Sequence, residues 1–265
     1  MRVVGRDAVP NGWTQESPLG RYRRRVRVHA DEQSAVAAIE DDAHRFEVKI
    51  THDRAIVTAL RVDAVRYPYT ICPAAVPALQ SLVGIALTRD ITAPSRAVAA
   101  SLCCTHQFDI AALAIAQSAR GPGQRMYDAA VRNQDGAKLA TLHRDGELVL
   151  NWAVRDNLIT SNDAAQGLSV RTVLRDLATA DENFVEAIFV MRRALLVAPG
   201  RMRPPEAHLE PWQMMDRMAG ACHSFQPENA PHGRFINTHF RDFENAPERL
   251  LAGWNDSLSP SLEKE

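Results

Sequence analysis

The feature that most constrains this chain is a strict two-residue alternation over residues 44–51, "HRFEVKIT". Ring-bearing or aliphatic side chains occupy every second position, and charged or hydroxyl side chains fill the positions between them. This period is typical of a β-strand with one buried face, because successive side chains point to opposite faces. The buried row comprises His44, Phe46, Val48 and Ile50. A turn at residues 52–54 and a second strand over about residues 56–67 then predict an antiparallel hairpin.

Elements on both sides of this hairpin predict an α+β protein. Residues 23–30 are expected to form a further strand, and the alanine-rich stretch "THQFDIAALAIAQSAR" to form a helix that ends near Gly121. Two Asp-Gly pairs, at residues 135–136 and 145–146, are typical of tight hairpin turns and predict a three-stranded meander. Further helices are expected over about residues 169–179 and 182–197, and in the second of these Glu186 is expected to face solvent.

The Gly-Pro-Gly at residues 121–123 is the clearest predicted boundary between lobes. We therefore expect an N-terminal antiparallel hairpin sheet with packed helices, followed by a second α+β lobe that contains the meander. The expected organisation is a loose arm at residues 1–20, a site-bearing lobe at residues 21–121 and a covering lobe at residues 124–265.

Composition excludes several classes of function. The 265 residues carry a net charge of −1, so neither a nucleic acid nor a membrane is an expected partner. No apolar run approaches the roughly 20 residues of a membrane helix, and the N-terminus lacks a signal-peptide pattern. Four cysteines do not make a disulfide framework in a chain of this length, which favours a reduced, cytoplasmic protein. A small-molecule substrate is expected, and a homodimer stays open.

A cluster of polar side chains is predicted where the hairpin meets the alanine-rich helix. Asp42 and His44 continue the buried row of the first strand, and buried polar groups need partners. Cys72 follows the second strand, while Cys104 and His106 open the helix, where exposed amides lower the pKa of a thiol. One turn later, Asp109 is placed to orient the imidazole of His106 or to act as a ligand.

Mixed carboxylate, imidazole and thiol ligands suit a single divalent metal, zinc or iron. The expected metal set comprises Asp42, His44, Cys72, Cys104 and His106. The spacing matches no short zinc motif, so a metal-free site and a core histidine among inert buried cysteines remain alternatives.

Other polar residues are further candidates for the same site. In "CHSFQP" at residues 222–227, adjacent side chains of an extended segment point to opposite faces, and His223 is the residue expected to reach a pocket. Tyr69 can wall an aromatic pocket or donate a phenolic proton. Arg193 is expected to face solvent, with a substrate carboxylate or a buried acid as the alternative partner. The run "RYRRRVRV" predicts a charged strand face, with an anion clamp as the alternative.

Several stretches resemble a bacterial family of uncharacterised proteins, the domain of unknown function 2889. They are spread over nearly the whole chain, and no activity is implied by the resemblance. The stretches are "RRRVRV", "EDDAHRFEVKITHD", "RYPYTICPAAVPALQSLVG", "CTHQFDIAALAIA", "LVLNWAV", "VMRRALLVAPGR" and "GACHSFQP".

Residues 41–118 also resemble the layout of iron–sulfur cluster scaffold proteins. The order of strands and helices agrees, and the metal positions of that family fall on residues 42–44, 71–73 and 104–106. Asp42 and His44 stand where that family has a cysteine and an aspartate, so a site rich in oxygen and nitrogen is implied, suited to zinc or iron as a Lewis acid.

These features together predict an enzyme, a lyase or hydrolase that uses a metal or a His/Asp acid–base pair. The expected substrate is small and aromatic, consumed in bacterial catabolism. His106 would be general base or ligand, and Asp109 would orient it. The expected catalytic set comprises His44, His106, Asp109, His223 and Tyr69. A metal-binding scaffold or delivery protein and a non-catalytic ligand-binding module are the alternatives.

Overall fold

In a computed structural model of the protein, the alternating segment forms β3 (Arg45–His52), which pairs antiparallel with β4 (Val57–Arg66). The structure describes residues 20–202 and 209–254. Phe46, Val48 and Ile50 are fully buried, which confirms the predicted hairpin and its buried face. The expected arm at residues 1–20 lies almost wholly outside the described residues.

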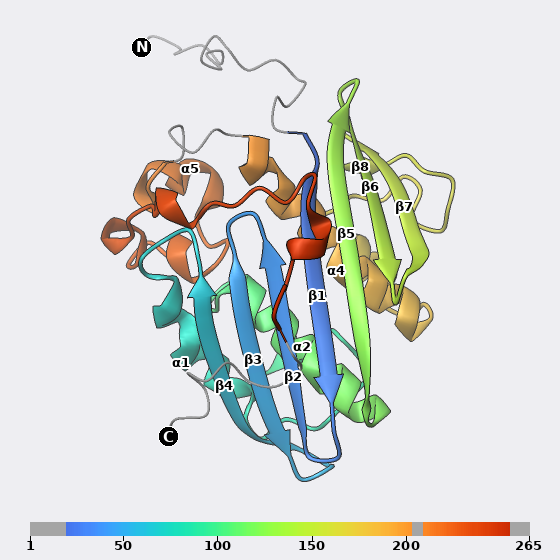
Figure 1. Cartoon of the computed structure of the whole chain (residues 1–265), viewed down its shortest axis with the longest axis vertical. Coiled ribbons are helices and arrows are strands. Elements are labelled where there is room, and N and C mark those ends of the chain that lie inside the picture. Colours follow the sequence, from blue (N-terminus) through green and yellow to red (C-terminus); the bar gives the residue numbers. More distant parts are fainter. Residues whose placement is uncertain (1–19, 203–208, 255–265) are drawn as a thin grey trace.

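All strands belong to one antiparallel sheet of eight, in the order β4-β3-β2-β1-β5-β6-β7-β8 (Figure 1). The remaining strands are β1 (Tyr22–Ala30), β2 (Ser34–Asp41), β5 (Gly123–Gln134), β6 (Ala137–Arg144), β7 (Glu147–Arg155) and β8 (Leu158–Ile159). β1 pairs with β5 along its whole length, from Tyr22 opposite Val131 to Ala30 opposite Gly123. The α+β class is confirmed, but the prediction of two separate lobes is wrong, since the sheet runs through the expected boundary.

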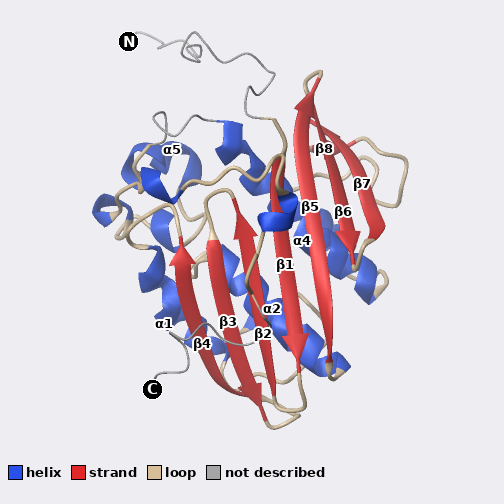
Figure 2. Ribbon diagram, viewed as in Figure 1, coloured by secondary structure: helices blue, strands red, loops and turns tan. Residues whose placement is uncertain are grey.

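Two long helices cover the same face of this sheet (Figure 2). α2 (Thr105–Arg120) packs on β1, β2 and β3, and α4 (Glu182–Val197) packs on β5, β6 and β7. The shorter helices are α1 (Val76–Leu79), α3 (Val173–Asp176) and α5 (Met215–Met218). The small alanine side chains of α2 are buried, so the helix can lie close to the strands that carry the site.

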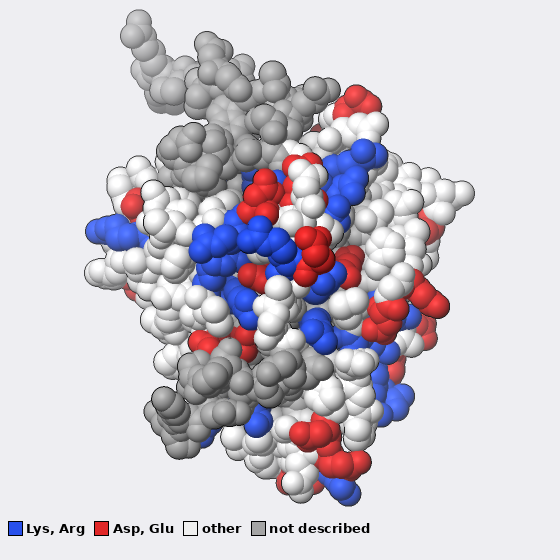
Figure 3. Space-filling view, viewed as in Figure 1, with Lys and Arg blue, Asp and Glu red and all other residues white. Residues whose placement is uncertain are grey.

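The opposite face of the sheet is covered in part by the C-terminal segment. Leu251 and Trp254 pack against Val36 and Ala38 of β2, so that seven of the eight residues of this strand are buried. The strand was not predicted, because a strand covered on both faces shows no alternation. On this face, basic and acidic side chains lie intermingled near the middle of the sheet (Figure 3).

Glu186 of α4 is fully buried, so its expected exposure to solvent is wrong. Its carboxylate accepts hydrogen bonds from Arg120 at 2.5 Å, from Arg125 at 2.8 Å and from the hydroxyl of Tyr127. This network ties the end of α2 and the start of β5 to α4. Among the described residues, no helix is long and apolar enough to cross a bilayer.

Candidate active site

The densest polar cluster on the helix-covered face consists of Asp41, His44 and His106, all of them buried. One potential ligand atom from each residue lies within 4.8 Å of those of the other two, so this group could hold a metal ion. The two imidazole rings stack with their centroids 3.8 Å apart and their planes inclined by 22°. The turn between β2 and β3 therefore meets the first turn of α2, as expected for His44 and His106.

Asp41 shapes this turn with its own side chain. Its Oδ1 accepts hydrogen bonds from the backbone N–H groups of Ala43 and His44, both at 2.9 Å. The same oxygen lies 2.8 Å from Nδ1 of His44. One carboxylate oxygen thus sets both the path of the turn and the orientation of the imidazole, a use of aspartate that is common in tight turns.

The other oxygen of Asp41 is held by β1. Oδ2 accepts hydrogen bonds from the hydroxyl of Tyr22 at 2.8 Å and from Nη2 and Nε of Arg24 at 2.5 and 3.1 Å. Burial by itself would raise the pKa of Asp41, but the interactions with the His44 ring and with the guanidinium of Arg24 outweigh it and hold that pKa well below the usual value. Asp41 is therefore a fully ionised carboxylate beneath the imidazoles.

His106 is held as a neutral imidazole. Burial lowers its pKa well below the usual value, and a proton on His44 and the positive charge of Arg24 each lower it further. Its Nε2 is buried and has no hydrogen-bond partner among the described residues, while its Nδ1 lies 4.0 Å from Sγ of Cys104. His44 and His106 keep 9% and 8% of their surface exposed, whereas Asp41 keeps 0%, so the two histidines lie closer to the solvent than the aspartate.

Asp42 does not join this group, although the two-residue period of the first strand predicted that it would. Its Oδ2 lies 3.1 Å from Nη1 of Arg201. The chain turns between β2 and β3, and this turn sets Asp41 opposite His44 and directs Asp42 elsewhere. Burial raises the pKa of Asp42 to about 7, and the charge of Arg201 opposes this shift.

Cys72, Cys103 and Cys104 are buried thiols and not thiolates. Burial raises the pKa of Cys72 to about 12, that of Cys103 to about 11 and that of Cys104 well above its usual value. The prediction that the start of α2 lowers the pKa of Cys104 is therefore wrong, because desolvation outweighs the helix amides. Cys72 lies next to Ser224, with 3.5 Å between Sγ and Oγ. Neither Cys72 nor Cys104, the two cysteines expected as ligands, belongs to the Asp41–His44–His106 group.

Asp109 is engaged by α4 and does not orient His106. Its two carboxylate oxygens accept hydrogen bonds from Nε and Nη2 of Arg193 at 2.5 and 3.1 Å. The buried-acid alternative for Arg193 is thus the one observed, and its expected exposure is wrong. This ion pair joins α2 to α4, and the positive charge of Arg193 also disfavours protonation of His106.

His223 and Tyr69 form hydrogen bonds with residues outside the Asp41–His44–His106 group. The backbone N–H of His223 donates to the carbonyl of Cys103 at 2.9 Å, so the expected approach of this segment to the start of α2 is observed. Nδ1 of the His223 ring, however, lies 3.2 Å from the side-chain amide of Asn229. The hydroxyl of Tyr69 donates to Sδ of Met214 at 3.7 Å.

Sequence reasoning missed Asp41, Tyr22 and Arg24. A signal was present in "RYRRRVRV", where Tyr22 and Arg24 share the two-residue period of Val26 and Val28 and so belong to the buried face. The anion that Arg24 binds is a carboxylate of the protein itself.

Comparison with known proteins finds one family that is similar to part of the chain. No curated protein matches the chain. Residues 22–119 match the family described as "Protein of unknown function (DUF2889)". This range includes β1 to β4 and most of α2, and hence Asp41, His44 and His106, but not α4 or the segment around His223. Over residues 22–119, the chain is similar to the DUF2889 family of proteins of unknown function.

Proposed function

We propose that this protein is an enzyme in which His44 acts as a general base and Asp41 positions it. The observation that carries the proposal is the hydrogen bond of 2.8 Å between Nδ1 of His44 and Oδ1 of Asp41. A carboxylate that accepts the Nδ1 proton fixes the tautomer, leaves the Nε2 lone pair available and stabilises the imidazolium that forms on proton transfer.

His106 supports this role because it stays neutral. Its neutral ring lies against His44 with 3.8 Å between the ring centroids, so one proton gained from a substrate would reside on His44, where Asp41 stabilises the charge. The buried and unpartnered Nε2 of His106 then serves as a hydrogen-bonding group toward the substrate.

Among the two reaction classes expected, the geometry favours a lyase over a hydrolase with a covalent intermediate. Covalent hydrolysis by a thiol requires an activated nucleophile beside the base. The thiol of Cys104 lies 4.0 Å from Nδ1 of His106, and burial raises the pKa of this thiol. Abstraction of a substrate proton by His44, followed by departure of a leaving group, requires no such nucleophile.

The side chains around the imidazoles suit a small aromatic substrate. The ring centroid of Phe46 lies 6.1 Å from those of His44 and His106, and Tyr67 stacks on Phe46 at 6.5 Å. Such rings pack favourably against another aromatic ring, so they can orient a substrate whose acidic proton faces His44.

A metal centre is the second candidate, because the ligand atoms of Asp41, His44 and His106 lie within 4.8 Å. Both oxygens of Asp41 already accept hydrogen bonds, from Tyr22, Arg24, the His44 ring and the turn. Binding of an ion by this group would therefore require Asp41 to give up at least one of these hydrogen bonds.

The test is a screen of small aromatic compounds that carry an acidic C–H group, followed by NMR for turnover and for exchange of that proton with D2O. Replacement of a general base lowers turnover by about 10²–10⁴-fold, which is expected for His44→Ala. His232→Ala, at an exposed histidine, is the matched control and should retain full activity.

The same preparations distinguish the two candidates. Elemental analysis that finds one equivalent of metal in the wild type and in His232→Ala, but none in His106→Ala, would favour the metal centre. Exchange and turnover that persist in His44→Ala would overturn the assignment of the general base.

A further inference from the structure

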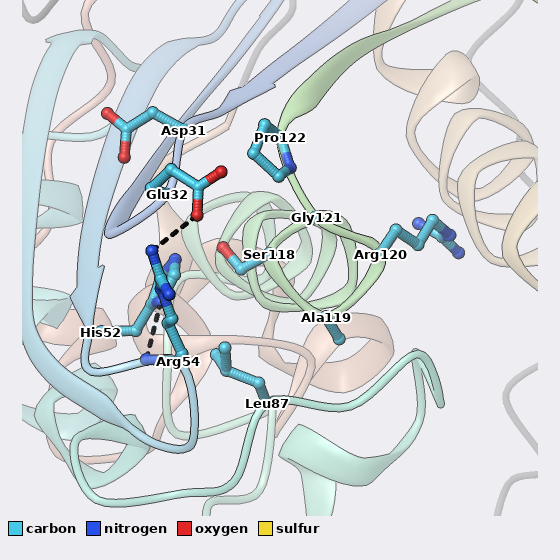
Figure 4. A pocket seen from close by; sticks show the side chains of 10 residues that line it. All are labelled: Asp31, Glu32, His52, Arg54, Leu87, Ser118, Ala119, Arg120, Gly121 and Pro122. Atoms are coloured by element: carbon cyan, nitrogen blue, oxygen red, sulfur yellow. Dashed lines mark hydrogen bonds and ion pairs between the residues drawn. The ribbon is translucent and has the colours of Figure 1, made fainter.

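A polar pocket lies at the opposite end of α2 from the stacked imidazoles (Figure 4). It has a volume of about 330 Å³. Its walls are the turn between β1 and β2, the turn between β3 and β4, and the last turn of α2 with the residues that follow it. The pocket is lined by Asp31, Glu32, His52, Arg54, Leu87, Ser118, Ala119, Arg120, Gly121 and Pro122.

Two buried polar atoms in the walls of this pocket lack partners. His52 and Ser118 are only 6% and 8% exposed, and neither Nε2 of His52 nor Oγ of Ser118 has a hydrogen-bond partner among the described residues. In Figure 4 the hydroxyl of Ser118 points across the pocket toward the side that carries His52. Because buried polar groups are nearly always satisfied, this pair indicates a polar molecule between them.

The hydrogen bonds of His52 define what this molecule must offer. Nδ1 of His52 accepts a hydrogen bond from the backbone N–H of Arg54 at 3.2 Å. The ring proton therefore resides on Nε2, which becomes a donor and not a metal ligand. The Ser118 hydroxyl can both donate and accept. The inner end of the pocket thus suits a hydroxyl or carbonyl oxygen.

The charges around the pocket favour a cation. At its mouth, Glu32 and Arg54 form an exposed ion pair with 2.8 Å between Oε2 and Nη2, so their charges cancel. Arg120 is bonded to Glu186 and points away from the pocket. What remains is the carboxylate of Asp31, which also accepts hydrogen bonds from Gln33 and Ser34 and lies in the field of Lys49. The C-terminal end of the 16-residue helix α2 adds a partial negative charge.

We propose that this pocket binds a small organic ammonium compound that carries a hydroxyl or carbonyl oxygen. Its ammonium group faces Asp31 and the end of α2, and its oxygen accepts from Nε2 of His52 and exchanges a hydrogen bond with Ser118. The position of Ser118 on α2 lies about 18 Å along the helix axis from that of His106, at about 1.5 Å per residue. The binding site is therefore separate from the stacked imidazoles.

Isothermal titration of the full-length protein with ethanolamine tests this proposal, since ethanolamine is a primary ammonium compound with one hydroxyl. Acetate and ethylene glycol serve as the anionic and neutral probes. Binding of ethanolamine at least tenfold tighter than that of either other probe is expected. Equal binding of ethanolamine and ethylene glycol, or tighter binding of acetate, would overturn the assignment of a cation.

Variants then locate the site. Ser118→Ala and Asp31→Asn should each weaken ethanolamine binding by about tenfold, the loss of one good hydrogen bond or charge. Asn at position 31 can still accept the turn hydrogen bonds from Gln33 and Ser34, so folding is preserved. Ser81→Ala, at an exposed serine, is the matched control. Unchanged affinity in both pocket variants would place ethanolamine elsewhere and refute the site.

Discussion

The imidazole rings of His44 and His106 lie face to face, with 3.8 Å between their centroids, above a carboxylate that contacts only one of them. A proton on one ring disfavours a proton on the other, because like charges repel at this distance. Oδ1 of Asp41 lies 2.8 Å from Nδ1 of His44, so the carboxylate favours a single proton on the ring of His44. The two rings differ in role although they are chemically identical.

Asp41 is expected to be the most costly single carboxylate to remove. Asp41→Asn leaves the guanidinium of Arg24, 1% exposed, without its counter-charge, and breaking a buried ion pair costs about 3–5 kcal/mol. The free energy of unfolding in urea measures this loss. Asp128→Asn is the control: it breaks the more exposed Arg25–Asp128 pair and should cost at most about 1 kcal/mol. Equal losses in the two variants would contradict the prediction.

Asp42 is expected to make stability depend on pH in the opposite sense from Asp41. Its pKa in the folded protein is about 7, against about 3.9 when unfolded, so the folded state binds the extra proton between these values. The free energy of unfolding of the wild type therefore falls as pH rises from 4 to 7.

Asp42→Asn removes this dependence. Relative to the wild type, the variant should gain up to about 4 kcal/mol between pH 4 and pH 8. Urea denaturation across this range measures the difference, with Asp216→Asn, at an exposed aspartate, as the control. A difference between Asp42→Asn and wild type that does not change with pH would show that Asp42 is not protonated in the folded protein.

The ion pair between Asp109 and Arg193 is expected to couple α2 to α4. Arg193→Met leaves the carboxylate of Asp109 buried without its partner and should cost about 2–4 kcal/mol. A double-mutant cycle with Asp109→Asn should give a coupling energy above about 1 kcal/mol. Arg175→Met, at a side chain that is 79% exposed, should change stability by less than about 1 kcal/mol. Additive effects of the Arg193 and Asp109 variants would rule out the coupling.

The cysteines are expected to resist alkylation in the folded protein. Only the thiolate reacts, and a pKa of about 12 for Cys72 and about 11 for Cys103 leaves very little thiolate at pH 7.5. The rate of reaction with iodoacetamide at these two positions, followed by mass spectrometry of peptides, should rise by at least about 100-fold in 8 M urea. Rapid labelling of Cys72 in the folded protein would show that the thiol is not buried as described.

The elements predicted from the sequence are those that carry a local signal of their own. β3 has one face in the core and so shows its two-residue period, and α2 shows the composition of a buried helix. β2 lies between α2 and the C-terminal residues Leu251 and Trp254, and it shows no period at all. When a strand is covered by residues from far along the chain, its own sequence shows no pattern that predicts this burial.

The two histidines of the candidate site, His44 and His106, were predicted from the sequence, whereas its acidic residue, Asp41, was missed. The two-residue period correctly placed His44 on the core face, but extending it to Asp42 required a strand where the chain turns. Asp41 belongs to β2, and its hydrogen bonds to the turn place it opposite His44. Likewise, Asp109 could not be assigned to Arg193 without the packing of α2 beside α4.

The pairing of β1 with β5 bears on how this protein should be divided for expression. The region similar to the DUF2889 family stops at residue 119, before β5 begins at Gly123. A fragment cut there would present the whole length of β1 as a bare edge with unpaired N–H and C=O groups, and such edges recruit further strands. Fragments that end at the family boundary should therefore self-associate, whereas those that extend past Gln134 keep this edge closed.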